Sequence, residues 1–465
     1  MNLSRRSLLA AAPFIQTKSR SAARPNVVFF LTDDHGAWAN GCYGAKDIQT
    51  PNVDALARGG ARFTQAFAST PVCSPSRMTY MTGCLPSTHG VQDWLIPEDA
   101  FGPKSRAWLD GHLTWSEVLA QAGYTLGMTG KWHMGHDDEA QRGFSYWATV
   151  PGGGGTYLDP EFVHNGVRKK TGKFKTDSVG DFALDFLSQQ KKENPFCLFV
   201  PFYAPHTPYD PTPEAYDAPY QNCAFRDYPK LPPNKHVNGG MKRMFVDSSA
   251  RGYSRLITGM DANVGRVVKR LEEMGLRENT LVIFSADQGW NAGHHGVWGK
   301  GNGTWPFNML EESIRVPLIW NHPGRIRPST PEPMVSSYDF FPTLLDYLGL
   351  KAPAEKKRVG QSYAGYVRGR APKDWRTRLY FEYANVRSVR TKNLKYIERA
   401  DGFENEMYDL EADPGETRNV IGEAGYGKQR AEFHEELTKY FEGIGAPPIE
   451  EWRKTVKQKM TVYKN

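Results

Sequence analysis

The sequence predicts an α/β fold with a large, mixed but mostly parallel central sheet flanked by helices, and a smaller C-terminal α+β subdomain. Three observations support this prediction: four short apolar runs rich in β-branched and aromatic residues, helical periodicity between them, and a change to short strands after residue 350. The length of 465 residues has room for one large domain with a smaller companion.

The four apolar runs are interpreted as buried strands, because near-continuous apolar character is typical of a parallel sheet covered on both faces. They are residues 27–31, 125–128, 196–200 and 281–284. Each run is followed by side chains equipped for chemistry, in chain order Asp33 and Asp34, Lys131 and His133, His206, and Asp287 and Gln288. Since ligands bind outside the carboxyl ends of parallel strands, we expect one composite site there.

Amphipathic helices separate these strands. Apolar residues recur at helical spacing over 176–187 and over 256–271. After residue 350 the pattern changes to short strands, 379–383 and 394–397, a turn and a final helix with Phe433, Leu437, Tyr440 and Phe441 on one face. We therefore divide the chain into a leading segment 1–23, a main domain 24–350 and a C-terminal α+β subdomain 351–465.

The composition is that of an ordinary globular protein, with 39% hydrophobic and 23% charged residues, and it excludes a disordered or collagen-like chain. No apolar run reaches the length of about 18 residues that a spanning helix needs, so no transmembrane segment is expected. Four cations of the net charge of +7 lie in the first 23 residues. We therefore expect no nucleic-acid partner.

The leading segment 1–23 has two arginines, Arg5 and Arg6, before a short apolar run, and it has no acidic residue. This pattern resembles a twin-arginine export signal, with small residues at 21–23 as a cleavage point. A basic N-terminal tail without a targeting role is the alternative. The predicted location is periplasmic or secreted.

The sharpest local signal is Cys73-Ser74-Pro75-Ser76-Arg77. It predicts a helix start, with Ser74 as N-cap and Pro75 in the first turn, so that Cys73 lies where helix N-termini favour an anion. A cysteine-phosphatase loop is excluded by spacing, because Arg77 is too close to Cys73. A buried structural cysteine remains the alternative for Cys73 taken alone.

Together with the Thr82-Gly83 that follows, this segment resembles the signature of type I sulfatases in the alkaline-phosphatase superfamily, whose cysteine is oxidised to formylglycine. Further segments resemble motifs of that family in the same order along nearly the whole chain after residue 23, namely 25–34, 50–57, 130–133, 204–208, 285–289 and 408–417. The resemblance implies that residues 24–350 are the catalytic domain. It also implies hydrolysis of sulfate monoesters, on a sulfated carbohydrate, and maturation by a formylglycine-generating enzyme.

Four polar side chains at two strand ends are suited to a hard cation. Asp33, Asp34 and Asp287 supply carboxylates and Gln288 an amide oxygen, the ligand types that Ca²⁺ and Mg²⁺ prefer. An Asp pair alone would be interpreted as a turn or helix cap. The resemblance implies that these four bind one divalent cation with the modified Cys73, Ca²⁺ being expected ahead of Mg²⁺. Gln288 departs from the Asn more common in the family.

The resemblance also implies roles in the reaction. The formylglycine at position 73, as its hydrate, is the nucleophile, and Arg77, Lys131 and Lys300 offset the charge on the sulfuryl oxygens. His206 is expected to be the general acid for the leaving group, and His133 the base that lets the aldehyde re-form. For Lys131 and Lys300 an ordinary surface lysine is the alternative.

Other residues near the motifs are candidates for the pocket wall only: Asp93, Trp94, Trp132, Tyr209, Asp210, His35, His136, His294 and His295. One further departure is Cys84, where the family commonly has Arg after Thr-Gly. Two rival functions stay open, a phosphatase or phosphodiesterase of the same superfamily, which usually has Ser or Thr in place of the cysteine, and a non-catalytic sulfoglycan-binding relative.

Overall fold

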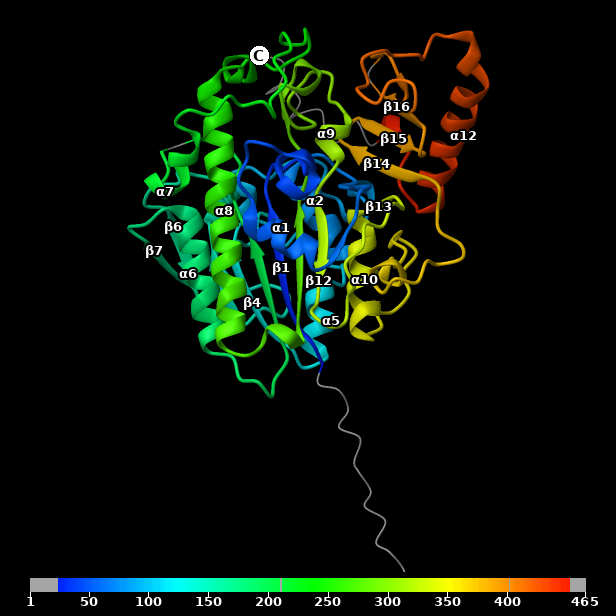
Figure 1. The fold of residues 1–465 in the computed structure, drawn as a ribbon. Helices are drawn as coiled ribbons and strands as arrows, with labels where there is room; N and C mark the ends of the chain where they lie inside the picture. Colours follow the sequence, from blue (N-terminus) through cyan, green and yellow to red (C-terminus); the bar gives the residue numbers. More distant parts are fainter. Residues whose placement is uncertain (1–23, 210, 401, 452–465) are drawn as a thin grey trace, which may run out of the picture.

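The computed structural model describes residues 24–451 except 210 and 401 (Figure 1). The leading segment 1–23, with its predicted export signal, lies outside the described residues. Within the described part, none of the helices combines the length and the apolar character that crossing a bilayer requires.

A nine-stranded mixed sheet forms the centre of the molecule, in the order β2-β12-β9-β1-β8-β4-β5-β6-β7. Its strands are β1 (Asn26–Thr32), β2 (Ala61–Arg62), β4 (Thr125–Gly130), β5 (Tyr146–Thr149), β6 (Glu161–His164), β7 (Val167–Lys170), β8 (Phe196–Pro201), β9 (Thr280–Ala286) and β12 (Leu318–Asn321). The five strands from β9 to β5 are parallel, and the outer strands at both sides are antiparallel. The four predicted strands are confirmed as β1, β4, β8 and β9, at the middle of the sheet.

Helices cover both faces of the sheet, so that strand β1 buries side chains on both of its faces. Its residues Val28 and Phe30 belong to one buried cluster, while Val27, Phe29 and Leu31 belong to the other. The first cluster lies against α1 (Pro51–Arg58), α6 (Lys175–Ser188) and α8 (Asp247–Glu273); the second lies against α2 (Cys73–Thr82), α5 (Trp115–Gln121) and α10 (Phe340–Leu348). Both helices predicted from periodicity are confirmed, as α6 and α8. A strand buried on both faces has no polar side to show, so its sequence is a continuous apolar run.

A second, four-stranded antiparallel sheet follows near the C-terminus, at the upper right in Figure 1. It consists of β14 (Leu379–Tyr383), β15 (Val386–Arg390), β16 (Leu394–Arg399) and β17 (Glu406–Asp409), with α12 (Gly427–Gly443) beside it. The predicted strands and the final helix are confirmed. Phe433, Leu437 and Phe441 are buried, while Tyr440 stacks on Tyr380 with ring centroids 3.5 Å apart.

The small sheet shares a buried core with loops and short elements of the preceding part of the chain. One buried cluster combines Phe67 and Phe307 with Phe381 of β14 and Phe433 of α12.

The remaining elements are short. The short helices are α3 (Pro86–His89), α4 (Pro97–Ala100), α7 (Glu214–Asp217), α9 (Glu311–Ile314) and α11 (Ala364–Val367), and the 3₁₀ turns include η3 (Pro151–Gly153), η5 (Met241–Met244) and η7 (His294–Gly296). Two strand pairs complete the set, β3 (Ala66–Phe67) with β13 (Val335–Ser336) and β10 (Asn291–Ala292) with β11 (Trp298–Gly299).

Candidate active site

The predicted nucleophile lies at the first residue of a helix. Helix α2 begins at Cys73, and its N-cap is Val72 in an extended conformation, without a side-chain cap. The prediction that Ser74 is the N-cap is therefore wrong, whereas Pro75 does lie in the first turn. The Ser74 hydroxyl instead accepts a hydrogen bond of 3.1 Å from the backbone N–H of Leu95, which ties the start of α2 to the neighbouring loop. Cys73 is 3% exposed, in the field of a helix N-terminus.

Three carboxylates and an amide meet beside Cys73, at the ends of β1 and β9. Gln288 Nε2 donates to Asp33 Oδ1 at 3.1 Å and to Asp34 Oδ1 at 2.6 Å. Asp287 lies next to them, its Oδ1 accepting from the Asp34 backbone N–H at 3.4 Å and its Oδ2 from Arg77 Nε at 2.8 Å. All four side chains are buried. The structure thus brings the predicted metal ligands together from segments more than 250 residues apart.

The donor chemistry of this cluster fits a hard divalent cation. Asp34 Oδ2 and Gln288 Oε1 are buried and have no hydrogen-bond partner among the described residues. Asp33, Asp34, Cys73 and His206 each offer one ligand atom, all within 4.8 Å of one another. Burial raises the pKa of Asp34, and burial together with the Asp33 charge raises the pKa of Asp287 well above its usual range. Neighbouring buried carboxylates of this kind need positive charge to stay ionised.

Three cationic side chains surround the same point. The Lys131 ammonium pairs with Asp33, Arg77 Nη2 lies 3.5 Å from Asp33 Oδ2, and Lys300 Nζ donates to Asp34 Oδ1 at 2.6 Å. Lys300 Nζ also donates to Cys73 Sγ at 2.8 Å. All three are buried, so the alternative of an ordinary surface lysine is wrong for Lys131 and Lys300.

The cations around Cys73 lower the pKa of its thiol. Burial raises the pKa of Cys73 and the Asp33 charge raises it further, yet the charges of Lys131 and Lys300 outweigh both and bring it well below its usual range. A low pKa is the property of a reactive cysteine rather than of an inert structural one.

Two histidines flank Cys73 from different loops. His206 follows β8, donates from Nδ1 to the Thr207 carbonyl at 2.6 Å, and has Nε2 3.6 Å from Asp34 Oδ2. His133 follows β4 and donates from Nε2 to the Leu95 carbonyl at 2.8 Å. Burial and the Lys131 charge lower the pKa of His133 to about 4, so its imidazole is neutral near pH 7. His133 Nδ1 is buried without a hydrogen-bond partner among the described residues and is free to accept a proton.

A cavity of about 310 Å³ opens onto this cluster. Asp34, Cys73, Lys131, His133, His206 and Lys300 all line it. The glycine-rich loop 152–154 forms part of its wall, and Gly153 has φ +65° with its Cα so close to His133 that a Cβ would lie 2.4 Å from the imidazole. Only glycine fits such a position.

Sequence reasoning missed several residues of the cavity wall, among them Trp290, Met241 and Asn302. Trp290 follows Gln288 closely in the sequence, so proximity to a motif could have indicated it. Asn302 follows Lys300 by two residues, so the same signal applies to it. Met241 comes from a loop that carries no motif, and the sequence contains no signal for it.

The predicted pocket candidates divide in the structure. Trp94 lines the cavity, as predicted. Trp132 does not, because its ring is buried against Phe144 and Trp147. Asp93 is buried behind the wall, where it accepts a hydrogen bond of 2.9 Å from the Tyr383 hydroxyl. Tyr209 lines a neighbouring cavity instead. Asp210 lies outside the described residues.

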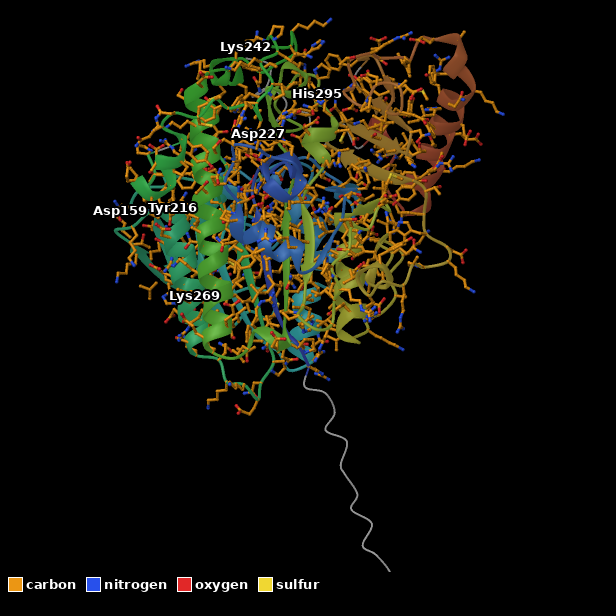
Figure 2. The ribbon with its side chains drawn as sticks, viewed as in Figure 1. Asp159, Tyr216, Asp227, Lys242, Lys269 and His295 are labelled. Carbon is orange, nitrogen blue, oxygen red and sulfur yellow. The ribbon has the colours of Figure 1, made fainter. Side chains whose placement is uncertain are left out.

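The other candidate histidines lie outside the cavity wall. His35 is buried beneath the site and pairs with Thr32 Oγ1 at 3.1 Å, and His136 pairs with Glu139 at 2.5 Å. His294 packs on the Trp38 ring, and His295 pairs with Glu312 in the loop labelled near the upper end of the molecule in Figure 2. Cys84 is buried and contacts the Thr82 carbonyl.

Comparisons with known proteins agree with this geometry. The family "Sulfatase" matches residues 25–350, and "N-sulphoglucosamine sulphohydrolase, C-terminal" matches residues 293–442. The chain is 27% identical to the N-acetylglucosamine-6-O-sulfatase of Bacteroides thetaiotaomicron, over 91% of this chain and 88% of that protein, and 27% identical to an ulvan-active sulfatase of Formosa agariphila, over 91% and 82%.

Among solved structures, one bound to its substrate D-glucosamine-2-N,6-O-disulfate superposes with a TM-score of 0.78 at 26% identity, over 92% of this chain and 99% of that chain. The family match covers most of the chain and includes every residue of the cluster around Cys73. The protein therefore belongs to the sulfatase family of the alkaline-phosphatase superfamily and is a sulfuric ester hydrolase.

Proposed function

We propose that the protein hydrolyses sulfate monoesters of a carbohydrate with a formylglycine made from Cys73 and one divalent cation. The observation that carries the proposal is the position of Cys73 at the start of α2, with Lys300 Nζ 2.8 Å from its sulfur at the base of a cavity. Asp33, Asp34, Asp287 and Gln288 would hold the cation, Ca²⁺ ahead of Mg²⁺. The cation would supply positive charge that polarises a sulfuryl oxygen and favours the deprotonated nucleophile.

The first step needs a nucleophile at sulfur and a proton for the departing alcohol. One hydroxyl of the hydrated aldehyde at position 73, ionised by loss of its proton to solvent, attacks sulfur, while Lys131 and Lys300 offset charge on the sulfuryl oxygens. A cation held by the carboxylate cluster would add positive charge at the same place. The Arg77 guanidinium donates to Asp287 and to the Lys131 carbonyl at 2.5 Å, and so holds both strand ends in position. His206 Nε2 gives a proton to the leaving oxygen as the S–O bond breaks.

The second step releases sulfate. The remaining hydroxyl at position 73 loses its proton to His133 Nδ1, the C–O bond to the sulfate breaks, and the aldehyde forms again. His133 can take this proton because its pKa, lowered to about 4 by burial and the Lys131 charge, leaves the imidazole neutral near pH 7.

The carbohydrate part of the proposal is supported by the wall of the cavity and by the relatives. Trp94 and Trp290 line the cavity, and indole rings stack on sugar faces. Both relatives described above act on sulfated sugars by their names. We further propose that residues 24–350 are the catalytic domain, that residues 351–465 are a separate subdomain, and that the segment 1–23 exports the protein to the periplasm or beyond.

The test begins with the mass of the tryptic peptide that spans residues 63–77, from protein made together with a formylglycine-generating enzyme. The expected result is the mass loss for conversion of the Cys73 thiol to an aldehyde. The converted protein is then assayed with matched sulfate and phosphate esters, and a preference for sulfate is expected. A phosphate preference by orders of magnitude would establish the phosphatase rival. Binding of sulfated sugars without sulfate release by converted protein would establish the non-catalytic rival.

A further inference from the structure

A second, larger cavity lies beside the catalytic one. Its volume is about 960 Å³, against about 310 Å³ for the catalytic cavity. Thr207 and Met241 line both cavities, so the two adjoin along these residues. Protein pockets that hold small-molecule ligands measure about 300–1,000 Å³, so the catalytic cavity has room for one sulfated sugar and the second for further residues.

The position of His206 indicates that the second cavity lies on the leaving-group side of the catalytic cavity. In the function proposed above, His206 protonates the oxygen of the departing alcohol, so it marks the side on which the sugar lies. Thr207, the next residue, is shared by both cavities, and Tyr209 belongs to the second one. A chain attached to the sulfated sugar would therefore continue past Thr207 into the second cavity.

The wall of the second cavity has the chemistry of a carbohydrate subsite. Asp217 of α7 accepts from Arg251 Nε at 2.8 Å and from Arg255 Nη1 at 3.3 Å, which fixes a carboxylate and guanidinium groups side by side. Both members of the Arg251–Asp217 pair are partly exposed, 35% and 16%, so a donor and an acceptor face solvent together. Sugar hydroxyls are both donors and acceptors, and a paired carboxylate and guanidinium can bind neighbouring hydroxyls.

An aromatic ring completes this wall. Tyr209 lies directly on α8, because Gly252 has no side chain; a Cβ there would come within 2.5 Å of the tyrosine. Arg255 Nη2 donates to the Tyr209 carbonyl at 2.9 Å and holds the same segment in place. Trp298 Nε1 also donates to the Tyr209 hydroxyl at 3.3 Å, so the tyrosine has a defined position in the cavity wall, against which a sugar can pack.

We propose that this second cavity is an oligosaccharide subsite, which binds the sugar residues next to the sulfated one through Arg251, Asp217 and Tyr209. This assignment rests on the proposed function, because that function places the leaving sugar beside His206. It specifies the substrate: the enzyme acts on sulfated oligosaccharides rather than on free sulfated monosaccharides. The subsite contributes to the binding of an oligosaccharide substrate, and it does not contribute to the binding of a small ester that occupies only the catalytic cavity.

The experiment compares two variants with a matched control in converted, full-length protein. Arg251→Ala removes the guanidinium, and Ser248→Trp fills the cavity from an exposed position while both members of the ion pair are kept. Arg270→Ala is the control, since Arg270 lies on the same helix, pairs with Glu273, and is no part of this wall. The substrates are 4-nitrophenyl sulfate and size-defined tetrasaccharides cut from heparin, chondroitin sulfate and ulvan.

The expected result is a fall of about tenfold or more in kcat/KM for the best tetrasaccharide in both variants, with 4-nitrophenyl sulfate changed less than about twofold and the control unchanged. Equal falls on both substrates, or no fall on the tetrasaccharide, would overturn the subsite. Hydrolysis of 4-nitrophenyl sulfate with no tetrasaccharide hydrolysed would also overturn it, and would leave the sulfatase function standing.

If converted protein hydrolyses neither substrate, the proposed function fails and calorimetry decides the subsite separately. Binding of a tetrasaccharide to the wild type that Ser248→Trp abolishes would then support the subsite. Absence of binding to the wild type would overturn it.

Discussion

Lys300 Nζ donates a hydrogen bond of 2.8 Å to Cys73 Sγ, although 227 residues separate them in the chain. Cys73 begins α2, and Lys300 follows the short strand β11. The same ammonium lies 2.6 Å from Asp34 Oδ1, so one cation contacts both the predicted nucleophile and a predicted metal ligand. Asn308 holds the Lys300 loop in place, donating to the Lys300 carbonyl at 3.0 Å.

This geometry predicts the effect of Lys300→Ala. The variant loses a buried positive charge beside Cys73, where we propose that the sulfuryl group binds, and we expect kcat/KM for sulfate esters to fall by about 10²–10³. Lys269→Ala, at an exposed site near the lower end of α8 in Figure 2, is the charge-matched control. Conversion of Cys73 is verified by mass in each protein, and a Lys300 variant that is converted and fully active would contradict the assignment.

His206→Ala should discriminate between leaving groups. Nitrophenolate leaves without a proton, whereas a sugar alkoxide needs one, so the loss of kcat/KM should be about 10²–10³ for a sugar sulfate and far smaller for 4-nitrophenyl sulfate. His236→Ala, at an exposed position, is the control. Equal losses on both substrates would argue against a general acid at His206.

His133→Ala should separate the two steps of the reaction. The first turnover still releases alcohol, but sulfate release is slow without the base, so stopped-flow assays of 4-nitrophenyl sulfate should show a burst that approaches one equivalent of enzyme, followed by a slow steady state. His136→Ala, three residues along and paired with Glu139, should behave as wild type. A His133 variant that is slow from the first turnover would place His133 elsewhere in the mechanism.

The carboxylate cluster predicts stabilisation by a divalent cation. Chelator-treated protein should unfold at a lower temperature, and added Ca²⁺ at a hundredfold excess over Kd should restore about 2.7 kcal/mol. Asp34→Asn should lose this response, while Asp247→Asn, at the exposed start of α8, should keep it. Thermal unfolding followed by fluorescence measures both, and an unchanged Tm in the wild type would contradict the cation site.

Asp137 predicts a pH dependence of stability. Burial raises the pKa of Asp137 to about 8, because its Oδ1 has no hydrogen-bond partner among the described residues, while Oδ2 accepts from the Gly152 backbone N–H at 3.0 Å. An unfolded Asp titrates near pH 3.9, so between that pH and about 8 the folded state binds more protons than the unfolded state. The free energy of unfolding therefore falls as pH rises through this window.

Asp137→Asn removes that slope and should be more stable than the wild type at pH 8, by about 1–3 kcal/mol. Denaturant unfolding at several pH values measures the difference. Asp138→Asn, one residue along, should leave the slope unchanged. A wild type whose stability does not fall between pH 5 and 8, as compared with the Asn variant, would contradict the buried, protonated carboxyl.

Part of the site could be predicted from sequence because its residues follow strands. Asp33 and Asp287 come directly after β1 and β9, which are adjacent and parallel, so their meeting is a consequence of sheet topology. Ser74 was mispredicted as a cap because the local pattern cannot show that its hydroxyl is used by Leu95, a residue in another loop.

Trp132 shows the same limit from the opposite side. It lies between Lys131 and His133, both of which line the cavity, yet its own ring packs against Trp147 in the core. Nearness in sequence does not decide which way a side chain points when the chain turns sharply, and His133 has φ +60°.

The sequence by itself determined the alternation of strands and helices, the order of the motifs and the types of residue at the strand ends, because apolar periodicity and local residue chemistry are properties of short segments. Only the tertiary structure decided the 2.8 Å approach of Lys300 to Cys73, the closure of the wall by Gly153 and Met241, and the second cavity beside Thr207. These depend on the packing of loops that are distant in the chain, and no local pattern encodes such distances.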